Sequence, residues 1–376
     1  MSLPPGRPKE GDVPLGGTAR SAREQICLPP EGGLAPAEAE ARSPKDAPIN
    51  TLLEIEDLAV HFPVGAGGFG RAARMLRAVD GVSLRMQAGK TLGIVGESGC
   101  GKTTLGRAIL RLLAPTSGTI RFEGRDITHA TGAELAPMRR ALQAIFQDPF
   151  GSLNPRLRVR DIVGEPLVNL GWPRARVEAR VAEVMRIVGL PPEYATRYPH
   201  AFSGGQRQRI GIARALAPSP RLIVCDEAVS ALDVSIQAQI LNLLKDVQAE
   251  FGVAYLFVSH NLAVVRHLSH RVAVMYLGRI VELSDEASLF AAPLHPYTAA
   301  LIAAVPEPDP TRALGPPALE GDLPSPLSPP SGCAFRTRCP IAAERCRHEA
   351  PALAEHVPGR FVRCHFPGTY RVKEAT

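Results

Sequence analysis

Apolar residues in this chain gather into short runs that Gly, Pro and polar residues separate, a pattern typical of β-strands. Runs of this kind recur along most of the chain rather than in one half of it. Strands are predicted over residues 52–62, 80–86, 91–95, 119–122, 142–146, 221–225, 253–258, 271–276 and 279–283.

Helices are expected between several of these strands. Helix-compatible runs lie at residues 105–113 and from 235 to about 251, and a further helix opens at Ser203. Residues 150–201 carry no strand signal, so we expect a mostly helical subdomain inserted into an α/β core. The heptad-like spacing of an amphipathic helix appears there in Val177, Val181, Val184, Met185 and Val188.

The two ends of the chain differ from this core in composition. Residues 1–50 are rich in Pro, Gly and Ala and poor in aromatic and branched apolar residues. Such a stretch cannot bury enough apolar surface to offset the entropy lost on ordering, so we expect a disordered tail. Residues 286–305 are expected to form a short helical stretch that carries HPYT at 295–298, and residues 306–330 a proline-rich linker.

One glycine-rich stretch carries the clearest chemistry. The sequence GESGCGKTT at 96–104 lies between a predicted strand and a predicted helix, which is the context of a phosphate-binding loop. Its glycines can turn backbone N–H groups inward as an anion nest, and the helix adds its positive dipole end. We predict a nucleotide triphosphate site, with Lys102 on the β- and γ-phosphates and the Thr103 hydroxyl on Mg²⁺. The phosphate-binding set is Gly96, Glu97, Ser98, Gly99, Cys100, Gly101, Lys102, Thr103 and Thr104.

Two carboxylates end the predicted strand at 221–225. Asp226 and Glu227 would lie at the carboxyl edge of the sheet, where strands of such folds line the ligand crevice. Asp226 would then sit beside the Mg²⁺, and Glu227 could polarise the water that attacks the γ-phosphate. An ordinary exposed acidic pair is the alternative, which the nearby phosphate loop disfavours.

A second anion nest is predicted at residues 203–206. Ser203 suits a helix N-cap, and Gly204, Gly205 and Gln206 follow it at the helix start. One triphosphate has little use for two nests in one chain, so the second would close over nucleotide held by another subunit. The alternative is a capped helix with a flexible entry.

In order and spacing, GESGCGKTT, FSGGQ, VCDEAVSALD and LFVSH resemble the nucleotide-binding subunits of ABC transporters, over about residues 51–285. The resemblance implies a P-loop NTPase (RecA-like) core with an antiparallel β subdomain and a helical subdomain at about 150–202. It also implies roles for single residues: Gln147 as the Q-loop glutamine that senses Mg²⁺, His260 as the switch histidine, Asp233 in the D-loop and Phe62 on adenine. Ala228 departs from the family, which has proline there, but no catalytic group is lost.

Four further motifs indicate a subfamily within the ABC transporters. RAVDGVSL at 77–84, QDPFGSLNP at 147–155, VSALDVSIQAQ at 229–239 and HPYT resemble the second ATPase subunit of dipeptide and oligopeptide importers. The resemblance implies a heterodimer with a homologous ATPase, two membrane permeases, an external solute-binding protein, and a C-terminal extension over residues 286–376. Related members import nickel, glutathione or sugars, so the solute stays open.

Four cysteines lie near the C-terminus, at Cys333, Cys339, Cys346 and Cys364. Four thiolates suit a [4Fe–4S] cluster or a tetrahedral zinc. The spacing is not the paired C-x-x-C of zinc ribbons and resembles the importer tail, where an iron–sulfur cluster is implied for some members. We favour the cluster over zinc, with metal-free thiols as the remaining alternative.

Composition and charge bear on where the protein is located and on whether it binds nucleic acid. The formal net charge is +6, but no basic block or aromatic-interleaved basic stretch stands out, so no nucleic-acid partner is expected. No apolar run approaches the roughly 18 residues of a membrane span, and no apolar signal segment opens the chain. These features favour the cytosol, and the resemblance implies a peripheral ATPase on the cytoplasmic side of the membrane. The alternatives are an ABC-type ATPase acting on ribosomes or DNA, which usually has two nucleotide domains in one chain, and a P-loop kinase.

Overall fold

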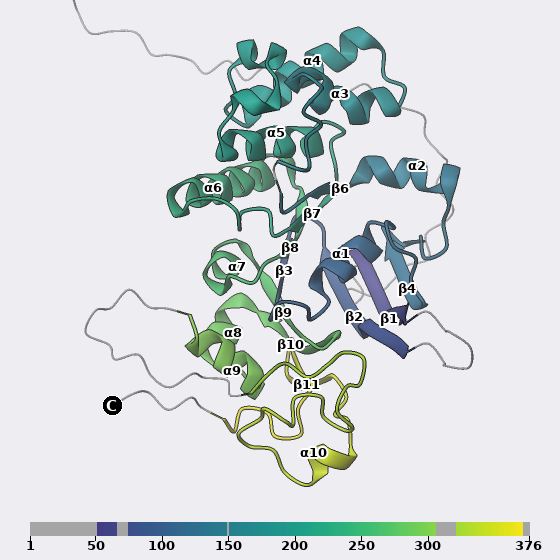
Figure 1. Cartoon of the computed structure of the whole chain (residues 1–376), viewed down its shortest axis with the longest axis vertical. Coiled ribbons are helices and arrows are strands. Elements are labelled where there is room, and N and C mark those ends of the chain that lie inside the picture. Colours follow the sequence, from purple (N-terminus) through teal and green to yellow (C-terminus); the bar gives the residue numbers. More distant parts are fainter. Residues whose placement is uncertain (1–50, 66–73, 149, 306–320, 371–376) are drawn as a thin grey trace, which may run out of the picture. The chain divides into compact units, whose positions relative to one another are not determined.

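The computed structural model describes residues 51–65, 74–148, 150–305 and 321–370 (Figure 1). The predicted tail over residues 1–50 lies outside the described residues, as does the part of the predicted linker at 306–320. Residues 321–330 of that linker are described and contain neither helix nor strand.

Two β-sheets form within the described residues, and the predicted α/β core with an antiparallel β subdomain is confirmed. The smaller sheet has the order β2–β1–β4–β5, and the larger has the order β11–β12–β10–β9–β3–β8–β7–β6. The strands are β1 (Thr51–Val64), β2 (Arg74–Gln87), β3 (Thr91–Val95), β4 (Ser117–Phe122), β5 (Arg125–Asp126), β6 (Leu142–Ile145), β7 (Leu222–Asp226), β8 (Ala254–Val258), β9 (Arg271–Tyr276), β10 (Arg279–Asp285), β11 (Ala354–Val357) and β12 (Arg360–Val362).

Helices follow or separate most strands of the larger sheet, as the alternation of patterns predicts. They are α1 (Lys102–Ile109), α2 (Gly132–Ala141), α3 (Val159–Asn169), α4 (Arg174–Ile187), α5 (Gly204–Leu216), α6 (Val234–Phe251), α7 (Leu262–Leu268), α8 (Glu286–Ala291), α9 (Pro296–Ala303) and α10 (Arg345–His348).

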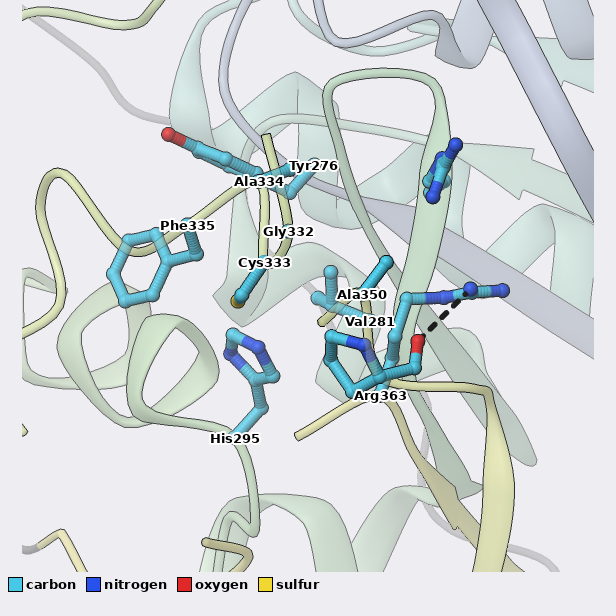
Figure 2. A pocket seen from close by; sticks show the side chains of 11 residues that line it. Tyr276, Val281, His295, Gly332, Cys333, Ala334, Phe335, Ala350 and Arg363 are labelled. Atoms are coloured by element: carbon cyan, nitrogen blue, oxygen red, sulfur yellow. Dashed lines mark hydrogen bonds between the residues drawn. The ribbon is translucent and has the colours of Figure 1, made fainter. Parts of the chain in front are cut away.

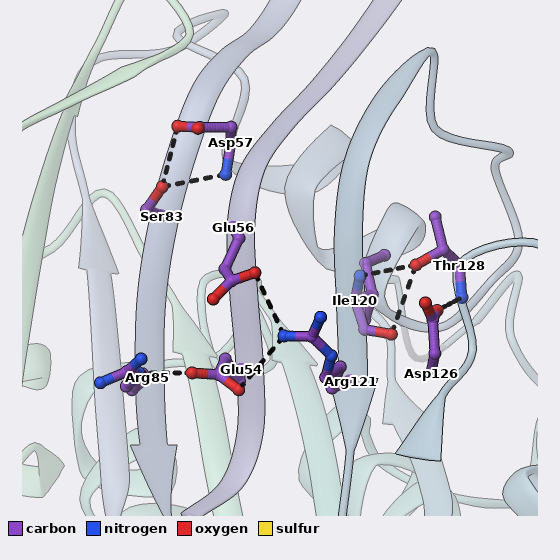
Figure 3. Close-up of polar contacts among 9 residues, drawn as sticks. All are labelled: Glu54, Glu56, Asp57, Ser83, Arg85, Ile120, Arg121, Asp126 and Thr128. Carbon is purple, nitrogen blue, oxygen red and sulfur yellow. Dashed lines mark hydrogen bonds and ion pairs between the residues drawn. The ribbon is translucent and has the colours of Figure 1, made fainter. Parts of the chain in front are cut away.

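The smaller sheet is antiparallel and has one apolar and one polar face, because side chains alternate along a strand. Leu53 and Ile55 of β1 are buried, whereas Glu54 between them faces cross-strand arginines (Figure 3). Its carboxylate lies 2.6 Å from Arg85 of β2 and 3.7 Å from Arg121 of β4. Pairs as exposed as these contribute less than about 1 kcal/mol each, so the apolar face carries most of the stability.

The centre of the larger sheet is parallel, and β3, β7 and β8 are buried along their whole length. Because parallel strands point the same way, their carboxyl ends meet at one edge of the sheet. The residues that follow β3, β7 and β8 in the sequence are therefore brought together. This edge carries the candidate site.

Helices α3, α4 and α5 pack against one another in the region predicted to be helical (Figure 1). The predicted amphipathic helix is α4, whose buried side chains include Val177 and Val181. Both valines lie against Gly164 of α3, where an added Cβ would stand 2.9 Å from Cγ1 of Val177. Close helix contact at this glycine fixes α4 on α3.

Three predicted elements were wrong in extent. The run at 105–113 ends as a helix at Ile109, because Arg111 has φ 56° and leaves Leu112 60% exposed. The single helical stretch at 286–305 is two helices, α8 and α9, since His295 is extended and caps the second. The sheet does not end at β10, because β12 pairs antiparallel with it.

Gly93 in β3 lies in close contact with helix α7 and the residue that follows it, and we expect Gly93→Ala to destabilise the protein by about 1–3 kcal/mol through overpacking. An added Cβ would stand 2.4 Å from Oγ of Ser269 and 2.5 Å from Cγ1 of Val265. The measurement is the urea unfolding transition. The control is Gly211→Ala in α5, where no atom lies within 4 Å of the added Cβ and helix propensity rises. A Gly93 variant as stable as the wild type would contradict this account of the packing.

Candidate nucleotide site

The glycine-rich loop lies where the sequence places it, between the buried strand β3 and helix α1. Gly96 has φ 152° and Gly101 has φ 107°, conformations that residues with a side chain rarely adopt. An added Cβ at Gly101 would stand 2.0 Å from the carbonyl oxygen of Ala78, and one at Gly96 would stand 2.2 Å from that of Met275. Both glycines are required for the loop to fit between β2, which contains Ala78, and β9, which contains Met275.

Lys102 begins α1 and folds back over the loop. Its side chain is buried, and Nζ donates to the carbonyl oxygens of Gly96 at 2.8 Å and Glu97 at 2.9 Å. The ammonium is therefore held inside the loop, ahead of the positive end of the helix dipole. Ser98 and Gly99 form the exposed tip. This arrangement suits an anion and fits a triphosphate.

Cys100 of the loop is buried, and burial raises the pKa of its thiol despite the nearby Lys102. The thiol is thus neutral at pH 7 and serves as a packing residue. Thr104 is half-buried in the first turn of α1.

Thr103 and Asp226 meet at the carboxyl edge of the sheet, although 123 positions separate them in the sequence. The Thr103 hydroxyl donates to Oδ1 of Asp226 at 2.9 Å. Burial raises the pKa of the Asp226 carboxyl, while this hydrogen bond and the charge of Arg107 act in the opposite direction. A hydroxyl and a carboxylate next to a phosphate loop are oxygen donors of the kind that Mg²⁺ takes.

Glu227 follows β7 in a strained backbone conformation, with φ 48°. Its N–H donates to the carbonyl oxygen of Val258 at 2.9 Å, which ties it to the end of β8. Its Oε1 lies 3.2 Å from Nδ1 of His260, and the glutamate is much less exposed than the histidine, 18% against 57%. Strain of this size persists only where the surroundings fix the residue, and it is common at functional sites.

The second predicted nest is a capped helix start. Oγ of Ser203 accepts from the N–H of Gln206 at 3.3 Å, and Oε1 of Gln206 accepts from the N–H of Ser203 at 3.0 Å, a capping box. An added Cβ at Gly205 would stand 2.5 Å from Ile236 of α6, so this glycine lets α5 and α6 approach. Gly204 is half-buried.

The remaining predicted residues lie on other elements than the phosphate loop and α1. Gln147 is exposed just after β6, and Asp233 is the exposed N-cap residue of α6. Phe62 lies in β1, half-buried against the apolar core of the smaller sheet. In the described part of the chain, no hydrogen bond joins Ser203, Gln147, Asp233 or Phe62 to the phosphate loop. Their roles stay predictions.

Two residues that the sequence reading did not assign to the site contact the loop. The hydroxyl of Tyr297 accepts from the N–H of Glu97 at 2.9 Å. The guanidinium of Arg338 makes two bonds to the Glu97 carboxylate, at 2.7 and 2.9 Å. The HPYT motif, which contains Tyr297, could have pointed to this residue. No feature of the sequence indicates that Arg338 contacts Glu97, because only the fold brings them together.

The four C-terminal cysteines are free and partly or fully buried. Burial raises the pKa of Cys339 and of Cys364 to about 11, so both thiols are neutral at pH 7. Cys333 lies beside His295 at a small cavity of about 20 Å³ (Figure 2). All four cysteines belong to the described residues, and no group of three or more His, Cys, Asp or Glu side chains there is placed to hold a metal ion. Charge interactions link Cys339 and Cys364 to each other and to Cys333 and Cys346, so the four thiols lie near one another. The [4Fe–4S] cluster or zinc stays a prediction.

Comparisons with known proteins agree with this geometry. The ABC transporter family profile matches residues 79–230, and the profile named "Oligopeptide/dipeptide transporter, C-terminal region" matches residues 281–346. A probable peptide ABC transporter ATP-binding protein of Sinorhizobium fredii is 57% identical over 84% of this chain and 90% of its own length. The oligopeptide transport ATP-binding protein AppF of Bacillus subtilis is 52% identical over 84% of this chain and 97% of its own.

Among solved structures, the dimeric ATP-binding cassette MJ0796, in a post-hydrolysis state with ADP and Pi, is similar with a TM-score of 0.56 and 27% identity. The similarity covers 62% of this chain and 99% of that one. Fold and phosphate loop thus define an ABC-type ATPase. The chain belongs to the ATP-binding proteins of the oligopeptide/dipeptide ABC transporter family, so the predicted family is confirmed. In the described residues, no helix is long and apolar enough to cross a membrane.

We expect Asp226→Asn to raise the midpoint of urea unfolding at pH 7 in buffer without nucleotide or Mg²⁺. The folded pKa of Asp226 lies above the value of 3.8 in the unfolded chain, so its ionisation costs folding free energy as pH rises from about 3.8 through the folded pKa. Asparagine keeps an oxygen that can accept from Thr103 but carries no charge. Asp233→Asn, at an exposed carboxylate, is the control and should change little. A less stable Asp226→Asn protein would contradict the assignment of burial as the cause.

Proposed function

We propose that this chain is the ATP-hydrolysing subunit of an importer that takes up dipeptides and oligopeptides. The observation that carries the proposal is the convergence of the phosphate loop with Asp226, Glu227 and His260 at one edge of the sheet. Family membership supports the transport role, because relatives matched over nearly their whole length are named as peptide or oligopeptide transport ATP-binding proteins.

The residues divide the work on the triphosphate. The loop N–H groups, Lys102 and the α1 dipole would bind the phosphates and cancel part of their charge. Glu227 would accept a proton from the attacking water, and His260, 3.2 Å away, would hold that carboxylate and contact the γ-phosphate. Mg²⁺, when bound, supplies charge neutralisation and Lewis acidity, and Thr103, Asp226 and Gln147 would hold it. Phe62 would stack on the adenine.

The nucleotide would be enclosed by two chains. Ser203, Gly204 and Gly205 cap an exposed helix start, which is free to face the triphosphate of a homologous ATPase subunit. Gln206 completes the cap, and Asp233 would lie at the same interface. The dimeric state of the cassette MJ0796 supports this arrangement. ATP binding would then draw two subunits together, and hydrolysis would release them.

The chain would divide its tasks by segment. Residues 51–285 would form the nucleotide-binding domain, with the helices at about 150–202 passing motion to two permeases on the cytoplasmic side of the membrane. Residues 286–376 would form the C-terminal extension, and an external binding protein would deliver the solute. Residues 1–50 would be a tail.

The cysteine cluster stays a prediction that the family resemblance alone supports. Iron quantitation and the visible absorbance of anaerobically purified protein test it. Iron at about four atoms per chain would support the cluster, and stoichiometric zinc without iron would end it.

Glu227→Gln is expected to lower ATP hydrolysis by at least about 100-fold while leaving ATP binding intact, because the amide cannot accept the proton. The variant should also accumulate a closed dimer with its partner ATPase. Phosphate release and size-exclusion chromatography measure the two effects. Glu286→Gln, at a carboxylate in the first turn of α8, is the control. Normal turnover in Glu227→Gln would refute the role of this carboxylate.

Transport itself is tested in proteoliposomes that contain the two permeases and both ATPase subunits. We expect ATP-dependent uptake of labelled peptide with the wild-type chain and a loss of at least about tenfold with Lys102→Ala, since the phosphates lose their buried cation. Uptake of nickel or glutathione in place of peptide would move the chain to another branch of the family.

A further inference from the structure

Glu97, the second residue of the phosphate loop, is held by two groups from the C-terminal part of the chain. The Arg338 guanidinium contacts both oxygens of its carboxylate, at 2.7 and 2.9 Å, and the Tyr297 hydroxyl accepts from its N–H at 2.9 Å. Side chain and backbone of one loop residue are therefore both fixed from outside the loop. The partners lie 200 and 241 positions away in the sequence.

The pair with Arg338 is not an ordinary surface ion pair. The Arg338 side chain is only 5% exposed and that of Glu97 is 28% exposed, whereas a comparable pair, Arg345 with Glu349, is 59% and 56% exposed. Solvent screens this bidentate contact little. The contact therefore fixes the orientation of the carboxylate as well as its distance from the guanidinium. Arg338 can thus determine where the Glu97 carboxylate points.

Arg338 is itself supported by the packing of Phe335. The N–H of Arg338 donates to the carbonyl oxygen of Phe335 at 3.0 Å, and the Phe335 ring is buried. This ring meets Tyr276 of β9 edge-on at 5.3 Å and lies 5.4 Å from Tyr297. One aromatic cluster therefore places both groups that hold Glu97.

Tyr297 is supported separately, at the start of α9. Both carboxylate oxygens of the fully buried Glu282 accept backbone N–H groups, from Leu294 at 2.8 Å and from His295 at 2.9 Å. His295 then caps α9 by accepting from the N–H of Tyr297 at 3.0 Å. These hydrogen bonds fix the backbone of the HPYT segment, and the Tyr297 hydroxyl connects this segment to the phosphate loop.

We propose that Arg338 and Tyr297 are positioning residues for the phosphate loop, and that the C-terminal segment sets the affinity of the chain for nucleotide through Glu97. Arg338 neutralises a carboxylate that belongs to the loop and would otherwise repel a triphosphate. It also holds that carboxylate toward the C-terminal segment, and Tyr297 fixes the backbone at the same residue. The proposal rests on the nucleotide site of the proposed function and adds a determinant of affinity outside the ABC motifs.

Equilibrium titration of the purified full-length chain with MgATP and with MgADP tests the proposal. Arg338→Gln should raise both Kd values by about tenfold, because it leaves the Glu97 carboxylate unpaired beside the phosphates. Arg338→Lys keeps the charge but not the two-pronged contact and should give a smaller rise. Tyr297→Phe removes only the hydroxyl and should raise Kd by about threefold. In steady-state hydrolysis, Arg338→Gln should raise KM and leave kcat near the wild-type value, since Glu227 and His260 are untouched.

Two further variants separate positioning from loss of structure. Arg345→Gln breaks a two-pronged arginine–glutamate pair on the same segment, away from the loop, and should leave Kd unchanged. Adding Glu97→Gln to Arg338→Gln removes the unpaired charge and should bring Kd part of the way back to wild type. A variant that is merely misfolded would lose kcat through its inactive fraction, with KM unchanged.

The outcomes also separate this inference from the proposed function. A wild-type Kd in Arg338→Gln, an equal effect of Arg345→Gln, or a double variant weaker than Arg338→Gln would overturn the inference while nucleotide binding stands. A wild-type chain that binds neither MgATP nor MgADP would overturn the proposed function itself.

Discussion

The structure depends on a close approach of backbone around the phosphate loop. The loop passes so near to the carbonyl groups of Ala78 and Met275 that there is no room for a Cβ at Gly101 or at Gly96. In this confined loop, the carbonyl oxygens of Gly96 and Glu97 accept hydrogen bonds from the buried ammonium of Lys102. The conformation of the loop is thus constrained by two strands outside it, β2 and β9.

The same edge of the sheet concentrates features that are unfavourable for stability. Asp226 is a carboxylate whose ionised form burial disfavours, and Glu227 has a left-handed backbone that costs on the order of 1–3 kcal/mol. Both residues are fixed by neighbours, Asp226 by Thr103 and Glu227 by the end of β8. Buried parallel strands provide the rigidity that keeps such residues in place without nucleotide.

The C-terminal segment is part of this support. Strand β12 pairs with β10, and Phe335 joins the aromatic cluster with Tyr276 and Tyr297. The segment therefore shares the sheet that carries the nucleotide site. An ion pair between Arg338 of this segment and Glu97 joins the segment directly to the phosphate loop.

The sequence by itself determined most strands and helices of the core, the phosphate loop and the two carboxylates at the end of β7, because each depends on local spacing and on neighbouring residues. It gave no prediction for β5, α2 or α7. It did not determine the end of α1, the division of residues 286–305 into two helices, or the strands β11 and β12, because tertiary contacts decide each of these. Nor could it reveal that Arg338 and Tyr297 hold Glu97. Contacts across about 200 positions arise only when the chain packs, and no local pattern of residues encodes them.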